Sequence, residues 1–263
     1  MTEGSTLSVI LFGSPFLLVG GASVRPLRTR QGYTLFAFLA LRSGKAVDRE
    51  FIAATLWPES DPDHARSGLR RSLTDLREAL GEAAGCIVAP TAHTLMLNLP
   101  SQAVDVPHFD SLLAGASPDS GRLRKAVDLY GGPLLEGFHE DWVQTERTRR
   151  EAAVCSALDL LARESRDTGN LPLAIAYLRQ GLWIDPSNEA FQRALMLAYY
   201  ESGNAAAMVR VYLQFRLFLR RSLATVPSTE TIDLFRRLRN GESLSAASPG
   251  YNREYVVPPN RRH

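Results

Sequence analysis

The sequence predicts two structural parts: an α+β part made of strands, three helices and a β-hairpin, then an all-α part built from helix pairs. Three observations carry this prediction. Short apolar runs bounded by Gly and Pro open the chain. Apolar residues then recur with helical spacing, and two of the helices have recognisable caps. Further on, a Gly-Asn pair at 169–170 recurs 34 residues later at 203–204.

The first elements are short strands followed by an apolar helix. Leu7–Phe12 and Phe16–Val19 are apolar runs that end at Gly, Ser or Pro, and they predict two strands. Val24–Leu27 predicts a third short strand. Apolar residues at helical spacing from Thr29 or Gln31 to Arg42, closed by Gly44, predict a helix that the core buries.

Residues 48–81 predict two helices joined by a tight turn. Asp48 is a plausible N-cap of the first helix, which Pro58 ends. Asp63 is a candidate cap for the second helix, which runs from about His64 to Leu80 and ends at Gly81. The buried face of the first helix is predicted to contain Phe51, Ile52 and Leu56.

The second of these helices has an apolar stripe and a basic stripe. Four leucines at spacings of 4, 3 and 4 share one face: Leu69, Leu73, Leu76 and Leu80. A ridge beside it contains Arg66, Arg70 and Thr74, with Arg77 on the same side and Ser67 and Arg71 further round. Such a helix can enter the major groove of DNA, where arginine forks recognise guanine. It can equally be a solvated surface helix whose arginines pair with Asp63, Asp75 or Glu78.

A β-hairpin follows, from Cys86–Val88 and Leu95–Leu97, with Thr91 and His93 near its tip. Strands, three helices and a hairpin, over residues 1–99, are the order of a winged helix with an added N-terminal sheet, the OmpR type. That resemblance implies a reading helix in the major groove and a wing over the adjacent minor groove. Such wings often have a glycine near the tip, where this chain has Ala92-His93.

Composition and charge are those of a globular protein. The 263 residues are 45% hydrophobic and 22% charged, and no run approaches the length of a membrane helix. The N-terminus lacks a secretory pattern, and two widely separated cysteines fit a reducing compartment, so a cytoplasmic location is expected. The net charge is only +2, but residues 25–49 contain six basic side chains and one acidic side chain. Further phosphate contacts are therefore expected from Arg28, Arg30 and Lys45.

No catalytic or metal-binding pattern is found in the sequence. Ser43-Gly44-Lys45 resembles the end of a phosphate-binding loop, but Leu39 occupies the position where that loop requires glycine. The five histidines show no metal-ligand spacing, and there is no Gly-x-Ser-x-Gly motif. We therefore expect no enzyme activity, cofactor or metal.

The second part, predicted over residues 104–240 after a connector at 99–106, reads as helices separated by Gly, Asn or Pro. The predicted helices span residues 118–130, 140–168, 171–184, 189–201, 205–223 and 229–240. The recurrence of 34 residues is the tetratricopeptide period. Helices 140–168 and 229–240 are expected to complete and cap the stack, and residues 241–263 are expected to be disordered.

The small or apolar positions of the first repeat unit are Leu158, Leu161, Ala162, Gly169, Ala174, Leu178 and Gly181. The second unit offers Leu195, Tyr199, Gly203 and Tyr212, and departs from the usual pattern at Met208 and Arg220. The three tryptophans, Trp57, Trp142 and Trp183, are expected to pack in the interior.

An OmpR-type winged helix followed by a tetratricopeptide-like region resembles the antibiotic regulatory protein family of bacterial transcriptional activators. The second part then corresponds to the family's bacterial transcriptional activation domain. The supporting stretches are Asp48–Pro58, Ala65–Gly81, Val104–Val106, Tyr130–Phe138, Trp142 and Glu146-Arg147. Many members have a further ATPase or sensor module, so the chain resembles a minimal form or a fragment.

The resemblance implies a mechanism as well as a fold. Two protomers bind tandem promoter sites as a homodimer on DNA and contact RNA polymerase, including its sigma subunit. The turn at Pro58–Asp63, with Glu59, Asp61 and Asp63, is implied as the polymerase contact, and the location as cytoplasmic and nucleoid-associated. A protein-interaction adaptor, in which the winged helix only packs, is the alternative function. The two differ in their response to Arg70→Ala, which abolishes DNA binding only under the activator reading.

Overall fold

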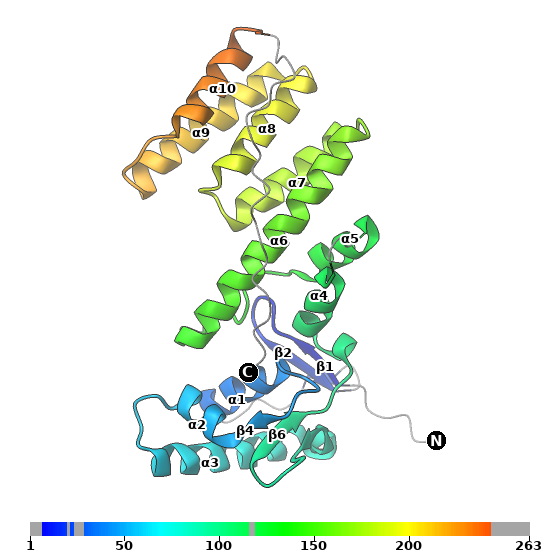
Figure 1. Cartoon of the computed structure of the whole chain (residues 1–263), viewed down its shortest axis with the longest axis vertical. Helices are drawn as coiled ribbons and strands as arrows, with labels where there is room; N and C mark the ends of the chain where they lie inside the picture. The colour runs from blue at the N-terminus through cyan, green and yellow to red at the C-terminus, as the bar shows by residue number, and fades with distance from the viewer. Residues whose placement is uncertain (1–6, 20–21, 24–28, 116–118, 243–263) are drawn as a thin grey trace. The chain divides into compact units, whose positions relative to one another are not determined.

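The computed structural model describes residues 7–19, 22–23, 29–115 and 119–242 (Figure 1). The chain divides into two compact units, the first ending at Thr168 and the second beginning at Gly169. Most of the described residues are helical, and the strands form two small antiparallel sheets in the first unit. None of the helices in the described ranges combines the length and apolar character needed to cross a bilayer.

The N-terminal sheet contains β1 (Leu7–Ile10), β2 (Phe16–Val19) and β3 (Ala22–Ser23) in that order. Strands β1 and β2 pair antiparallel with Leu7 opposite Val19. The two predicted strands at the start of the chain are therefore present. The third strand of the sheet is at residues 22–23, and the strand predicted at 24–27 lies outside the described residues.

Three helices follow the sheet: α1 (Arg30–Ala40), α2 (Arg49–Leu56) and α3 (Pro62–Leu80). The Asp48 carboxylate accepts hydrogen bonds from the N–H groups of the first turn of α2, as the sequence predicts. The cap of α3 is Asp61 rather than Asp63, because Pro62 suits the first helical position and its missing N–H costs nothing there. Phe51 was expected in the buried face of α2, but its side chain is 54% exposed.

The predicted wing is present as β5 (Ile87–Val88) and β6 (Thr94–Leu97), which pair with Ile87 opposite Leu97. A strand that the sequence did not indicate, β4 (Val47–Asp48), pairs with the other edge of β6. It joins the start of α2 to the base of the wing. A short 3-10 helix at Gly81–Cys86 connects α3 to the hairpin.

The first unit also contains α4 (Asp105–Leu113), α5 (Ser120–Leu129) and α6 (Asp141–Asp167). Helix α4 was not predicted; its Pro107 lies in the first turn, where proline is tolerated. The Asp105 carboxylate accepts hydrogen bonds from the N–H groups of Leu11 and Phe12 at 2.9 Å. Contacts of this kind tie α4 to the N-terminal sheet, so the compact units do not divide at the predicted boundary between residues 99 and 104.

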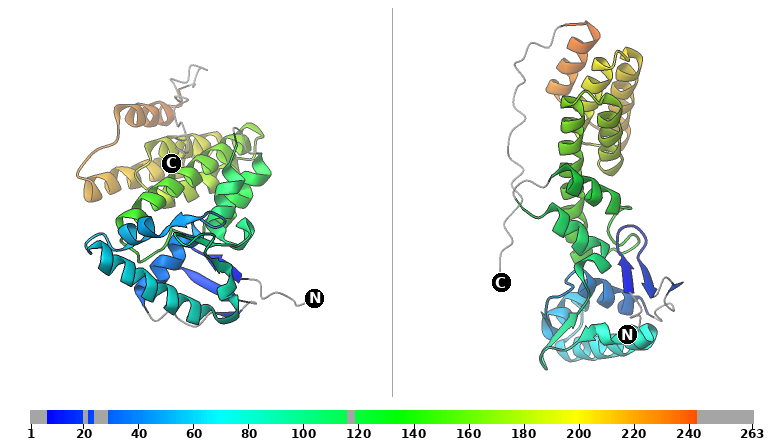
Figure 2. Two further views of the ribbon diagram at one scale, coloured as in Figure 1. Left: turned by 60° about the horizontal axis from the view of Figure 1, so that its bottom comes forward. Right: turned by 90° about the vertical axis from the view of Figure 1, so that its right-hand side faces the viewer.

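The second unit contains α7 (Leu171–Ile184), α8 (Glu189–Glu201), α9 (Ala205–Ser222) and α10 (Thr229–Arg239), which run back and forth (Figure 2). Gly169 and Gly203 precede α7 and α9 with φ angles of +77° and +74°, which glycine adopts without strain. Helices α7 and α8 approach closely where a Cβ on Gly181 would lie 2.8 Å from the Phe191 ring. This is the small-residue position that the repeat predicted.

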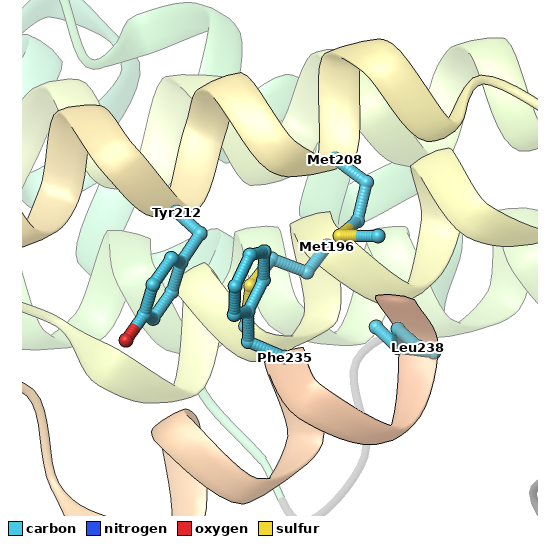
Figure 3. Packing of buried hydrophobic residues seen from close by; sticks show 5 residues of the cluster. All are labelled: Met196, Met208, Tyr212, Phe235 and Leu238. Atoms are coloured by element: carbon cyan, nitrogen blue, oxygen red, sulfur yellow. The ribbon is translucent and has the colours of Figure 1, made fainter. Parts of the chain in front are cut away.

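Helix α10 packs against both α8 and α9 (Figure 3). Its Phe235 ring stacks on Tyr212 with centroids 3.8 Å apart and planes 8° from parallel. The cluster, completed by side chains from α8, α9 and α10, contains Met196, Met208, Tyr212, Phe235 and Leu238. Met208 is therefore the core residue at the position where the repeat usually has a small one.

The tryptophans divide by location. Trp57 and Trp142 are half-buried, and Trp142 packs edge-on against Phe38 with ring centroids 5.3 Å apart. Trp183, which was also expected to pack, is 68% exposed. Its position on α7 shares a helical spacing with apolar neighbours, but the described helices of the second unit leave most of its side chain uncovered.

Candidate nucleic-acid interface

Helix α3 presents opposite faces to the protein and to solvent. Its leucine face is buried against α1 and α2, with Leu69, Leu73, Leu76 and Leu80 each at most 5% exposed. All six polar residues that the sequence predicted for the reading face are exposed: Arg66, Ser67, Arg70, Arg71, Thr74 and Arg77. Because burial of the leucines fixes the rotation of the helix, it also fixes which way the arginines face.

The position of α3 against α2 depends on a glycine. A Cβ built on Gly68 would lie 2.8 Å from Cε2 and 2.9 Å from Nε1 of Trp57, closer than real Cβ contacts come. Trp57 is the C-cap residue of α2, so its indole lies where the two helices meet. The sequence contained both residues, but nothing in their spacing indicated that they touch.

The exposed arginines of α3 differ in their partners. The Arg66 guanidinium donates to Glu50 Oε1 at 3.1 Å and to Asp63 Oδ1 at 2.7 Å. The hydrogen bond with Asp63 raises the pKa of Arg66. The ion pair with Asp63 is the alternative that the sequence left open for this residue, and Glu50 is a second partner from another helix.

Arg70 is free of such a partner. Its Nε donates to the Arg66 carbonyl at 3.4 Å, and no ion pair with a carboxylate is found for it among the described residues. Thr74 donates its hydroxyl proton to the Arg70 carbonyl at 3.1 Å, and Asp75 accepts from the Thr29 hydroxyl at 3.0 Å. Of the two arginines on this ridge, Arg70 is consequently more available to an incoming anion than Arg66.

The charge of the reading face is positive overall. Between Arg66 and Arg77 the helix has four arginines and a single carboxylate, that of Asp75. Arg71 and Arg77 are both exposed and lie to either side of the Arg70–Thr74 ridge. This balance suits the phosphate backbone of DNA, which attracts cations without regard to sequence.

The wing is tied to the start of α2 near its tip. The His93 carbonyl accepts a hydrogen bond from the Arg49 N–H at 2.8 Å. The two hydroxyl oxygens of Thr91 and Thr94 lie 2.8 Å apart, and the His93 N–H donates to Thr91 Oγ1 at 3.2 Å. These hydrogen bonds close the turn without a glycine at its tip. The side chains of Thr91 and His93 are exposed.

The other predicted phosphate contacts are distributed differently. Lys45 is exposed in the turn before β4. Arg30 is engaged within the first unit, where it pairs with Glu140 at 3.3 Å and lies 5.1 Å from the centre of the Phe138 ring. Arg28 lies outside the described residues.

The turn between α2 and α3 contains three exposed carboxylates with different roles. Asp61 accepts hydrogen bonds from the N–H groups of Asp63 and His64 at 3.1 Å each, and the His64 N–H bond is the main cause of its lowered pKa. Asp63 pairs with Arg66, whereas no partner is found for Glu59 among the described residues. Glu59 is therefore the acid of this turn that is least engaged in the fold.

Comparisons with known proteins agree with this architecture. The bacterial transcriptional activator domain matches residues 111–239. The chain is 27% identical over 231 residues to the regulatory protein AfsR of Streptomyces coelicolor, covering 83% of this chain and 23% of AfsR. It is 28% identical over 243 residues to the transcriptional regulator RedD of the same organism, covering 86% of this chain and 66% of RedD. The chain thus spans under a quarter of AfsR and just under two thirds of RedD.

A solved structure shows the same fold. Mycobacterium tuberculosis EmbR, in complex with a low-affinity phosphopeptide, superposes with a TM-score of 0.68 at 22% sequence identity. The match covers 91% of this chain and 66% of the EmbR chain. Of these two relatives by sequence, AfsR is a regulatory protein and RedD is a transcriptional regulator.

Proposed function

We propose that the chain is a member of the antibiotic regulatory protein type of bacterial transcriptional activators and acts as a sequence-specific DNA-binding activator, a proposal supported by the activator-domain match and by the two regulatory relatives. The observation that carries this proposal is the exposed arginine ridge of α3, held outward by a buried leucine face and flanked by a wing. A helix of this shape and charge fits the major groove of a DNA duplex.

The residues divide by the contacts they would make. Arg70 enters the major groove and donates to guanine O6 and N7, with Thr74 and Ser67 beside it. Arg71, Arg77 and Lys45 contact phosphates, and Thr91 and His93 reach the minor groove from the wing. Arg66 contributes to base or phosphate recognition after its guanidinium leaves Glu50 or Asp63, and Arg30 and Arg28 remain weaker phosphate candidates.

Activation would follow from recruitment of the transcription machinery. Two copies bind tandem promoter sites as a homodimer on DNA, and each presents its α2–α3 turn to RNA polymerase, including the sigma subunit. Within that turn Glu59 is the free carboxylate, since Asp61 caps α3 and Asp63 pairs with Arg66. Action on promoter DNA implies a cytoplasmic, nucleoid-associated location. The proposed activity requires no cofactor or metal.

Selection from fragmented genomic DNA tests the proposal directly. The full chain, Arg70→Ala and the control Arg124→Ala, an exposed arginine of α5 in the same unit, are compared at two salt concentrations. We expect the full chain and the control to enrich a repeated motif. Loss of one bidentate contact should weaken binding to that motif by about 10- to 100-fold in Arg70→Ala.

The opposite results would overturn the proposal. Enrichment without a motif, or equal enrichment by Arg70→Ala and the full chain, would show that α3 does not read sequence. That outcome would favour the adaptor alternative, in which the winged helix only packs and Arg70→Ala changes nothing.

A further inference from the structure

Helices α7, α8 and α9 enclose a groove of about 700 Å³ within the second unit. Its floor is made by Gln192 and Leu195 of α8 and by Phe215 of α9, all of them buried. Trp183 of α7 forms part of the wall and is 68% exposed, the largest apolar side chain so exposed among the described residues. The volume lies in the range of grooves that bind ligands.

The cations of this groove are not neutralised by the fold. Arg179 of α7 and Arg210 of α9 both line it, both are exposed, and no ion pair is found for either among the described residues. No Asp or Glu is among the residues that line the groove. By contrast, Arg193 of the same unit pairs with Glu230 at 3.4 Å.

Contacts between the helices hold the floor of the groove in place. The Gln192 side chain is 3% exposed and donates from Nε2 to the Val211 carbonyl at 3.0 Å, which joins α8 to α9 beneath the groove. The close approach of Gly181 to Phe191 joins α7 to α8 in the same way. A pre-formed groove loses little conformational entropy when a partner binds.

We infer that this groove binds an acidic peptide segment of another protein. Carboxylates of the segment pair with Arg179 and Arg210, and an apolar or aromatic side chain packs between Trp183 and the floor at Leu195 and Phe215. Guanidinium–carboxylate hydrogen bonds are among the stronger polar contacts, and a partly exposed indole is a common anchor for a partner's apolar side chain.

Charge argues against the other occupants. The chain's own C-terminal segment, residues 243–263, contains three arginines and one glutamate, so it would be repelled by the two groove arginines. A nucleic acid would require a continuous basic track along its backbone, whereas the lining of this groove has two cations, Arg179 and Arg210. An acidic segment with apolar residues matches both these cations and the apolar side chains of the groove.

Fluorescence anisotropy with a labelled peptide tests the inference on the full chain. The probe is a short peptide in which Asp and Glu alternate with Leu and Phe; a second probe has Lys at the acidic positions, and a third is a single-stranded oligothymidylate. We expect saturable binding of the acidic probe only. Trp183→Ala should weaken it by about 10-fold, the loss expected for one anchor side chain.

Charge reversal makes the test specific to the groove. In the variant Arg179→Glu/Arg210→Glu, preference should invert so that the Lys probe binds and the acidic probe does not. The matched control is Arg220→Glu, an exposed residue of α9 that does not line the groove, and it should retain the original preference. These side chains are all exposed, so the helical circular dichroism of each variant should be unchanged.

Three results would overturn the inference. The first is binding of the acidic probe that Arg179→Glu/Arg210→Glu leaves unchanged, and the second is no saturable binding of that probe by the full chain. The third is tighter binding of oligothymidylate that the same double variant abolishes, which would assign the groove to nucleic acid. None of them depends on α3, because Arg70→Ala should bind the acidic probe as the full chain does.

Discussion

Gly68→Ala should destabilise the protein although alanine favours helices more than glycine does. The substitution places a methyl group 2.8 Å from Trp57 Cε2, and the indole cannot move away freely because Trp57 is half-buried at the end of α2. Forcing an extra carbon into such a contact costs about 1–3 kcal/mol. Replacing glycine inside a helix returns about 0.5–1 kcal/mol.

The net expectation is a loss of about 0.5–2 kcal/mol in the free energy of unfolding. The sign should reverse when the obstacle is removed. In a Trp57→Ala background, Gly68→Ala should stabilise the protein by about 0.5–1 kcal/mol, because only the helical preference remains. The difference between the two backgrounds measures the contact itself.

Urea unfolding followed by tryptophan fluorescence is the assay. Trp142 reports on the first unit in both backgrounds because its ring packs against Phe38. DNA binding by Gly68→Ala should also weaken, since α3 must shift against α2. Equal or greater stability of Gly68→Ala in the presence of Trp57 would refute the reasoning, because the close approach would then impose no constraint.

Two further predictions concern the core and the response to acid. Phe235→Ala removes the ring stacked on Tyr212 and should cost about 3–5 kcal/mol, seen as a lower urea midpoint, whereas truncation of exposed Leu213 should change it little. Burial alone would raise the pKa of Glu146, but the attraction and hydrogen bond to Arg150, together with the nearby charges of Arg42 and Arg149, outweigh it and hold that pKa below its ordinary value. The stabilisation is therefore present above the ordinary carboxylate pKa and is lost as the pH falls through the lowered one. Acid unfolding of Glu146→Gln should show a weaker pH dependence, and an unchanged profile would contradict this assignment.

The helices of the second unit could be predicted closely because their ends are marked. Asn170 and Asn188 each cap the helix that follows, and the predicted bounds of α7 and α8 match the structure. The spacing of apolar residues did not show which helix faces are covered by another element. Phe51 and Trp183 follow apolar periodicities yet are exposed, since a periodicity shows which residues share a face and not whether another element packs on it.

The reading face of α3 shows the same division between local and distant information. Its exposed and buried sides follow from leucine spacing, which is local. The difference between Arg66 and Arg70 is set by Glu50, which lies 16 residues before Arg66 on another helix. A sequence pattern alone could not rank the two arginines, whereas the structure identifies Arg70 as the unpaired one.

Ion pairs join α6 to α4 and to the end of α1 within the first unit. Arg150 of α6 is 2% exposed and pairs with Asp110 of α4 at 2.9 Å. Glu146, one turn earlier, pairs with both Arg150 and Arg42, which follows α1. A cut near residue 100 would remove Glu146, the ion-pair partner of Arg42, and leave the Leu11 and Phe12 N–H groups without the Asp105 carboxylate. The region proposed to bind DNA ends with the hairpin of β5 and β6, but the compact unit that contains it extends through α6.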